Sequence, residues 1–151
     1  MRLESNAFRN NESIPKKYAC DGDKVNPPLN FYEVPPGTKT LALIMEDPDV
    51  PRNLRPDGMF DHWLIWNMPA NIKGIAEDSE PNGVVGQNTR GTLEYVPPCP
   101  PDRQRRYIFT LYALDTNLQL SRTSGKGELL KAMTGHIIVE SQLIGRYNRQ
   151  K

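Results

Sequence analysis

Two short segments hold the side chains best suited to chemistry in this chain. They are Asp47-Pro48-Asp49-Val50-Pro51 and, ten residues later, Asp61-His62-Trp63. Pro48 lacks an N–H and favours an extended conformation for the residue before it, which excludes a helix here. Extended residues two positions apart point the same way and lie roughly 7 Å apart. The carboxylates of Asp47 and Asp49 could therefore face one cavity.

Two carboxylates and an imidazole suit three kinds of site. Paired carboxylates with separated pKa values could serve a hydrolase as acid and base, and Asp47, Asp49 and His62 could hold a divalent metal ion. In the third interpretation, both aspartates hold His62 and backbone N–H groups in place, as loop carboxylates commonly do. The chain has no Gly-x-Ser-x-Gly, P-loop or Rossmann glycine pattern. We therefore expect the third role, without turnover, metal or cofactor.

His62 is the candidate anion ligand among the two histidines of the chain. A nearby aspartate favours the charged imidazole, and a protonated His62 could bind an anion. His136 lacks comparable neighbours among the candidate site segments. The alternative is that His62 is a structural histidine whose nitrogens are bonded within the protein.

Charge and composition exclude several classes of protein. Nineteen basic and eighteen acidic residues give a formal net charge of +1, so no overall field attracts nucleic acid or an anionic membrane. The longest apolar run, residues 41–45, is far too short to span a membrane, and the N-terminus lacks an apolar signal segment. We expect one cytoplasmic domain of residues 1–151.

The two cysteines, Cys20 and Cys99, are too few for a disulfide framework or a four-cysteine zinc site. They could pair only if the fold brings them together. In a reducing cytosol, two free thiols are the expectation.

The elements that must position the candidate site are mostly strands. Fourteen prolines and eleven glycines among short apolar runs are typical of an all-β domain with long loops. Apolar patterns predict strands at residues 38–45, 62–68, 106–114 and 137–147. One helix is predicted at 126–133, with Thr123 or Ser124 as N-cap and Gly135 ending it. Polar loops are predicted at 11–20 and 78–90, the second turning at Asn82-Gly83.

Several motifs in this order resemble those of the phosphatidylethanolamine-binding protein family, in its short bacterial and archaeal, Raf kinase inhibitor protein-like branch. The resemblance covers nearly the whole chain, and the order and spacing of the motifs make it specific. The matching segments are Ile14-Pro15-Lys16-Lys17-Tyr18-Ala19-Cys20-Asp21-Gly22, Asn26-Pro27-Pro28-Leu29, the two segments above, Tyr95 with Pro98-Cys99-Pro100-Pro101, Arg106-Tyr107, Gly135-His136 and Gly145-Arg146-Tyr147.

Membership of this family would imply a mainly β fold, with a large antiparallel central sheet, a smaller second sheet and one or two short helices. It would also imply a non-catalytic binding or regulatory protein with a small surface pocket for phosphate-like anions or phospholipid head groups. The ligand-binding residues carried over are Asp47, Asp49, Val50, His62, Pro100, Pro101, Arg105 and Tyr107.

Arg105 marks a departure from the family pattern, which usually has Gly-x-His-Arg-Tyr where this chain has Arg103-Gln104-Arg105-Arg106-Tyr107. A guanidinium offers a planar fork of donors suited to phosphate or carboxylate. Arg105 shares a strand face with Tyr107, the family's pocket tyrosine, so we expect it to face the pocket. The alternative is a solvated arginine.

The resemblance also leaves an interaction role open, because inhibition of a serine protease or a kinase is reported in parts of this family. The proline-bracketed loop at residues 52–58, with two arginines, is a plausible contact surface. The sequence does not rank a protease against a kinase, and it leaves the oligomeric state open, including a homodimer.

Overall fold

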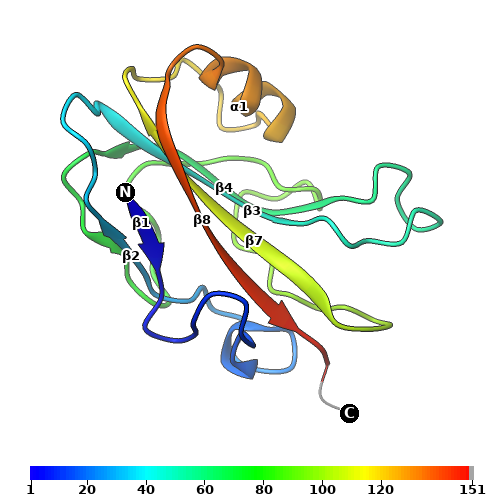
Figure 1. The fold of residues 1–151 in the computed structure, drawn as a ribbon. Coiled ribbons are helices and arrows are strands. Elements are labelled where there is room, and N and C mark those ends of the chain that lie inside the picture. The colour runs from blue at the N-terminus through cyan, green and yellow to red at the C-terminus, as the bar shows by residue number, and fades with distance from the viewer. Residues whose placement is uncertain (150–151) are drawn as a thin grey trace.

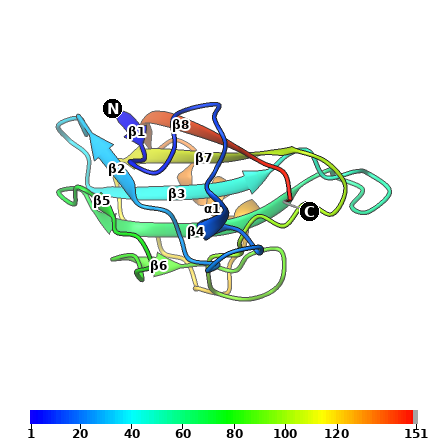
Figure 2. The same cartoon turned by 90° about the horizontal axis from the view of Figure 1, so that it is seen from below.

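The computed structural model describes residues 1–149, which form two antiparallel β-sheets. The large sheet has five strands in the order β6-β4-β3-β7-β8, and the small sheet has three in the order β1-β2-β5. Figures 1 and 2 show the long strands side by side, with the loop between β3 and β4 projecting beyond their ends. The strands are β1 (Arg2–Glu4), β2 (Leu29–Tyr32), β3 (Thr40–Asp47), β4 (Phe60–Pro69), β5 (Gly74–Ile75), β6 (Val84–Val85), β7 (Arg105–Leu114) and β8 (Ile137–Tyr147).

Strand β3 lies at the centre of the large sheet and is apolar on both faces. Leu41, Leu43 and Met45 pack into the larger core with residues of β1 and β2. Ala42 and Ile44 pack into a second cluster on the opposite face, together with the buried residues of the helix described next. A strand covered on both faces reads as a continuous apolar run, which explains the pattern seen in the sequence.

The α-helix α1 (Lys126–Met133) has the predicted bounds, although its N-cap differs from the prediction. The cap is Gly125, whose N–H donates to the Glu128 carboxylate at 2.6 Å, and neither Thr123 nor Ser124. Gly135 follows the helix with φ of 83°, the left-handed conformation expected of a helix stop.

The predicted mainly β architecture is confirmed, with differences at the element boundaries. The strands predicted at 106–114 and 137–147 match β7 and β8 to within one residue. Strand β3 begins two residues later than predicted and ends at Asp47, while β4 begins at Phe60. The two predicted loops contain short elements, namely β6 and the 3₁₀-helix η1 (Lys16–Tyr18).

Cys20 and Cys99 form a disulfide, so the prediction of two free thiols is wrong. The segment after η1 packs against the chain before β7, where the Cys20 N–H donates to the Pro98 carbonyl at 3.0 Å. The Tyr95 hydroxyl donates to the Tyr18 carbonyl at 2.9 Å in the same region. These contacts join segments almost eighty residues apart, which no local pattern reveals.

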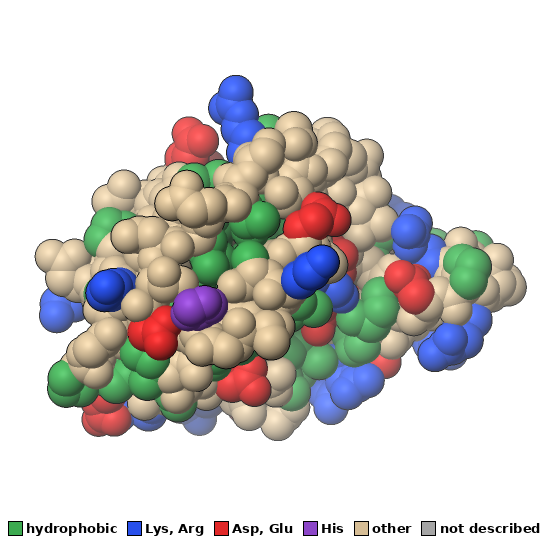
Figure 3. Space-filling view, turned by 90° about the horizontal axis from the view of Figure 1, so that it is seen from above, with side chains coloured by type: hydrophobic (Ala, Val, Ile, Leu, Met, Phe, Trp, Pro, Cys, Tyr) green, Lys and Arg blue, Asp and Glu red, His purple; other side chains and the backbone are tan. Residues whose placement is uncertain are grey.

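Charged side chains of both signs are interspersed over the face shown in Figure 3, in keeping with the small net charge. Within residues 1–149, no helix is long and apolar enough to cross a membrane.

Candidate ligand-binding site

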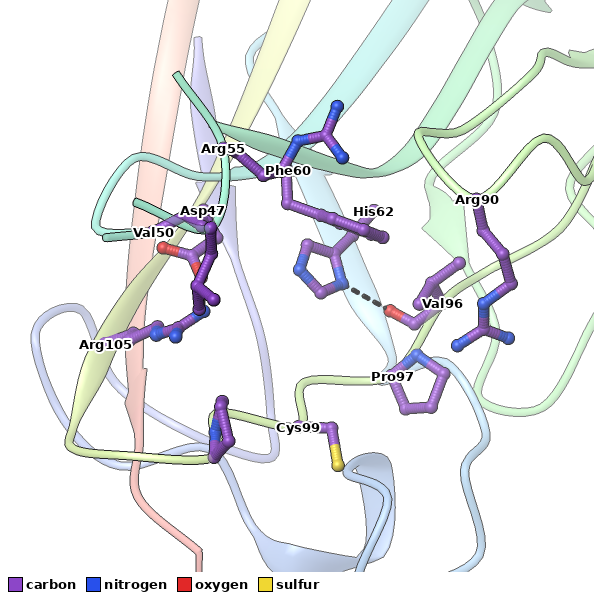
Figure 4. Close-up of a pocket in the computed structure, with 12 residues that line it drawn as sticks. Asp47, Val50, Arg55, Phe60, His62, Arg90, Val96, Pro97, Cys99 and Arg105 are labelled. Atoms are coloured by element: carbon purple, nitrogen blue, oxygen red, sulfur yellow. Dashed lines mark hydrogen bonds and ion pairs between the residues drawn. The ribbon is translucent and has the colours of Figure 1, made fainter. Parts of the chain in front are cut away.

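A cavity of about 360 Å³ lies where β3 ends and where β4 and β7 begin. These three strand ends meet because β3 pairs with both neighbours, placing Asp47 opposite Phe60 and Glu46 opposite Ile108. Loops close the remaining sides (Figure 4). The lining residues are Asp47, Val50, Leu54, Arg55, Phe60, His62, Arg90, Val96, Pro97, Cys99, Pro101 and Arg105.

Asp47 and Arg105 form a buried ion pair in the wall of this cavity. Arg105 Nη1 lies 3.2 Å from Asp47 Oδ2, and Arg105 Nη2 lies 3.0 Å from Asp102 Oδ1. The second Asp47 oxygen accepts the Asp49 N–H at 2.8 Å. Burial raises the pKa of the Asp47 carboxyl, although the Asp49 N–H and the Arg105 guanidinium act in the opposite direction. Arg105 therefore faces the cavity as predicted, with part of its charge already neutralised.

Asp49 points away from the cavity and binds Arg106. Its carboxylate accepts the Arg106 backbone N–H and Nε, both at 2.9 Å, and Nη2 at 2.8 Å. These bonds lower the pKa of Asp49. The expectation that both carboxylates face one cavity holds for Asp47 and fails for Asp49. The reason is that β3 ends at Asp47, so the extended geometry does not continue through Pro48.

His62 occupies a β-bulge at the start of β4. Met45 pairs with Trp63 and Glu46 with Asp61, which leaves His62 as the extra residue. A bulge re-aims side chains and is common beside functional sites. The His62 ring packs against the Tyr107 ring, with 5.2 Å between centroids, and against the Phe60 ring at 4.8 Å.

The His62 ring is neutral at physiological pH, contrary to the expectation that an aspartate would favour the charged form. Burial lowers its pKa to about 4, and the charges of Arg90 and Arg105 act in the same direction. The Val96 carbonyl, 2.7 Å from Nδ1, opposes this shift without overcoming it. The Val96 N–H also donates to the His62 backbone carbonyl at 3.0 Å, so Val96 contacts both the ring and the backbone of His62.

Arg55 and Arg90 line the cavity, and sequence reasoning did not place them there. Within the described part of the chain, neither guanidinium has a hydrogen bond or an ion pair, and Arg55 lies 6.0 Å from the centroid of the Phe60 ring. Both belong to long loops, which have no periodic pattern that places their side chains. The only available signal was that residues 52–58 and 78–90 flank the strands that carry Asp47 and His62.

The other predicted site residues divide into lining and supporting positions. Val50 and Pro101 line the cavity. Pro100 and Tyr107 are buried and do not line it, and Tyr107 acts as the surface on which the His62 ring packs. Among residues 1–149, no group of three or more His, Cys, Asp or Glu side chains is placed to hold a metal ion.

Residues 4–148 match the family model described as phosphatidylethanolamine-binding protein. The chain belongs to this family. The UPF0098 protein of Chlamydia muridarum is 46% identical over 149 residues, and the match covers 99% of both chains. The UPF0098 protein of Methanothermobacter thermautotrophicus is 43% identical over 155 residues, again over 99% of both chains. Such relatives confirm the predicted bacterial and archaeal branch of the phosphatidylethanolamine-binding proteins.

Solved structures of phosphatidylethanolamine-binding protein relatives support the same assignment. A crystal structure of a putative homologue from Chlamydia trachomatis is 45% identical, with a TM-score of 0.97 over 99% of this chain and 97% of that chain. YbcL of Escherichia coli is 25% identical, with a TM-score of 0.88 over 99% and 98% of the two chains.

Proposed function

We propose that this phosphatidylethanolamine-binding protein relative is a non-catalytic binding protein whose cavity receives a phosphate-like anion or a phospholipid head group. One observation carries the proposal. Three arginines, Arg55, Arg90 and Arg105, line the cavity, and among the described residues Asp47 is the one lining residue that has a carboxylate. Guanidinium groups bind phosphate and carboxylate oxygens through charge-assisted hydrogen bonds.

The size and walls of the cavity suit a small ligand with an apolar part. Ligand sites typically measure about 300–1,000 Å³ and combine apolar walls with a few polar groups. Here Val50, Leu54, Phe60, Val96 and Pro97 supply apolar surface beside the arginines. A phosphate with a small organic substituent would place its charge on the arginines and its substituent on these side chains.

The lining supports binding without turnover. Among the described residues that line the cavity there is no serine, threonine or lysine, and the Cys99 sulfur is held in the disulfide. A nucleophile of one of these types is what covalent catalysis commonly requires. His62 has a pKa of about 4, far below the value at which a general base works best near neutral pH.

The test is isothermal titration calorimetry with inorganic phosphate and glycerophosphoethanolamine. Arg90→Ala should weaken binding about tenfold to a hundredfold, because it removes charge-assisted hydrogen bonds to the ligand. Arg122→Ala is the matched control, since it removes the same charge at an exposed position outside the cavity. Equal affinities for Arg90→Ala and the unchanged protein, or His62-dependent hydrolysis of a phosphoester, would overturn the proposal.

A second candidate function is inhibition of a serine protease or a kinase through the loop between β3 and β4. This loop projects from the molecule in both ribbon views. Leu54 in this loop is 59% exposed, and the Arg52 guanidinium donates to the Pro56 carbonyl at 2.9 Å, which helps to fix the loop conformation. Preorganised loops lose little entropy on binding. Tight stoichiometric inhibition in a protease and kinase panel, lost in Leu54→Ala, would support this role.

A further inference from the structure

We propose that the cavity selects an oxyanion that still carries a proton, such as a singly protonated phosphomonoester, over one that carries none, such as sulfate. This inference rests on the proposed anion-binding function and adds the protonation state of the ligand. It follows from the hydrogen-bond acceptors that share the cavity with the arginines.

The first acceptor is Nε2 of His62. Its other ring nitrogen, Nδ1, lies 2.7 Å from the Val96 carbonyl oxygen, which can only accept, so Nδ1 carries the ring proton. In a neutral ring, Nε2 then presents a lone pair. Figure 4 shows this nitrogen on the side of the ring turned from Val96 toward Asp47 and Val50. It has no hydrogen-bond partner among residues 1–149.

The second acceptor is the carboxylate of Asp47. Its oxygens accept one hydrogen bond each, from the Asp49 N–H and from Arg105 Nη1. A carboxylate has about four lone-pair sites, so Asp47, which lines the cavity, keeps acceptor capacity beyond these two bonds. The residues that line the cavity therefore include two arginines without hydrogen-bond partners in the described structure, an unpaired acceptor on His62, and a carboxylate on Asp47 whose acceptor capacity is only partly used.

A ligand oxygen next to His62 Nε2 or the Asp47 carboxylate must be protonated, so that it can donate a hydrogen bond to the acceptor. Sulfate could bind the arginines, but its remaining oxygens would set lone pairs against Nε2 of His62 and the Asp47 carboxylate. A singly protonated phosphomonoester has the same tetrahedral shape and offers one O–H to an acceptor. An unmatched buried polar group lowers affinity by about tenfold to a hundredfold, which sets the expected discrimination.

The pH dependence of binding should come from the ligand. The charged groups that face the cavity are Asp47, Arg55, Arg90 and Arg105, and the arginines stay charged throughout. The His62 ring stays neutral above its pKa of about 4, and burial raises the pKa of Tyr107 behind it. Among these groups, Asp47 is the one whose titration could also change the affinity between pH 6 and pH 8. Sulfate binding measures this contribution, because sulfate itself does not titrate in this range.

The experiment is calorimetry of the full chain with methyl phosphate, sulfate and glycerophosphoethanolamine at pH 6 and pH 8. A phosphomonoester has its second pKa near 6, so methyl phosphate should bind about fiftyfold more weakly at pH 8 than at pH 6. At pH 6 it should bind at least about tenfold more tightly than sulfate, whose affinity should change little with pH.

Three outcomes would overturn the inference in distinguishable ways. Equal affinities for sulfate and methyl phosphate would remove proton selection and leave anion binding intact. Tighter binding of glycerophosphoethanolamine than of methyl phosphate at both pH values would show that an ammonium group supplies the hydrogen. Binding of none of the three would reject the anion-binding function itself.

Substitution of His62 gives a second test. In His62→Gln the side-chain amide can donate as well as accept, so the preference for methyl phosphate over sulfate should fall to a few-fold or less. His136→Gln is the control, because His136 is exposed and outside the cavity, and it should keep the full preference.

If His62→Gln does not fold, nitrogen-15 NMR of the unchanged protein tests the same point. His62 should show a neutral ring with its proton on Nδ1 from pH 5.5 to pH 8. Methyl phosphate, and not sulfate, should shift the Nε2 resonance. A charged ring at pH 7, or equal shifts with both anions, would overturn the inference.

Discussion

Two aspartate–arginine pairs lie in opposite environments in this protein, although their aspartates are two positions apart in the sequence and their arginines are adjacent. Asp47 and Arg105 pair in the cavity wall, where their side chains are 1% and 8% exposed. Asp49 and Arg106 pair at the outer surface, where the exposed fractions are 25% and 42%. Burial raises the pKa of Asp47, whereas the Arg106 hydrogen bonds lower that of Asp49.

The difference shows that neighbouring residues of one strand can have different roles because they lie on opposite faces of the sheet. Arg105 and Arg106 are consecutive in β7, so their side chains leave opposite faces of the sheet. One arginine therefore reaches the cavity and the other holds the loop that follows β3. The buried pair is costly to break because each partner would leave an unpaired charge, whereas the exposed pair is solvated in either state.

Breaking the buried pair should have the largest effect. In Arg105→Ala the Asp47 carboxylate stays buried and keeps, in the described structure, only its hydrogen bond from the Asp49 backbone N–H, so the free energy of unfolding should fall by about 3–5 kcal/mol. Urea denaturation measures this loss, and calorimetry should show weaker phosphate binding. Asp47→Asn/Arg105→Met should recover part of the stability, because it removes both charges. A loss below about 1 kcal/mol for Arg105→Ala would mean that water reaches the pair.

The disulfide stabilises the cavity that contains the buried pair. Cys99 lines this cavity, and its bond to Cys20 joins the cavity wall to the segment after η1. Cys20→Ser/Cys99→Ser should lower the free energy of unfolding by about 2–5 kcal/mol, since the bond closes a long loop in the unfolded chain. Thermal denaturation with and without a reductant measures the same effect in the unchanged protein. Identical melting temperatures in the two conditions would contradict the prediction.

Acidification should lower the free energy of unfolding through protonation of His62, which lines the cavity. Its folded-state pKa, about 4, lies below its ordinary value of 6.5, so the stability it contributes is present above pH 6.5 and lost as pH falls toward 4. The loss should be on the order of 3 kcal/mol. Denaturant unfolding at pH 7 and pH 4 should show a smaller loss in His62→Gln than in the unchanged protein. Equal losses in both would assign the acid sensitivity to other groups.

Breaking the exposed pair should have the smallest effect. Arg106→Ala should lower the free energy of unfolding by about 1 kcal/mol or less, since the Arg106 backbone N–H still binds Asp49. Phosphate affinity should stay within about twofold, because Arg106 is outside the cavity lining. A large loss of affinity would show that the loop position, set by Asp49, controls the cavity.

Much of the fold could be predicted from local patterns. Alternation of period two identified β7, and β-branched and apolar residues identified β8. The cap candidates before residue 126 and the stop at Gly135 identified α1. The ordered motifs led to the family, which the comparisons confirm. The two-residue strand β6 was missed because Val84 and Val85 are too few to set a pattern, and their pairing with β4 depends on a distant segment.

The candidate site was predictable in its strand-borne residues and not in its loops. Asp47, His62 and Arg105 lie at strand ends, where pairing of neighbouring strands brings them together. Arg55 and Arg90 come from loops, which have no periodic pattern that tells which of their side chains meet the strand ends. For the same reason, the sequence did not separate the roles of Asp47 and Asp49.

By itself, the sequence determined the four long strands, the helix, the family and the segments that carry the polar groups, because these depend on local spacing and residue type. Tertiary structure alone decided which aspartate enters the cavity, that His62 is neutral, and that Cys20 bonds Cys99. Each of these depends on burial or on a partner distant in the chain, such as Val96 for His62. Desolvation and non-local contacts exist only once the chain has folded, so no local pattern contains them.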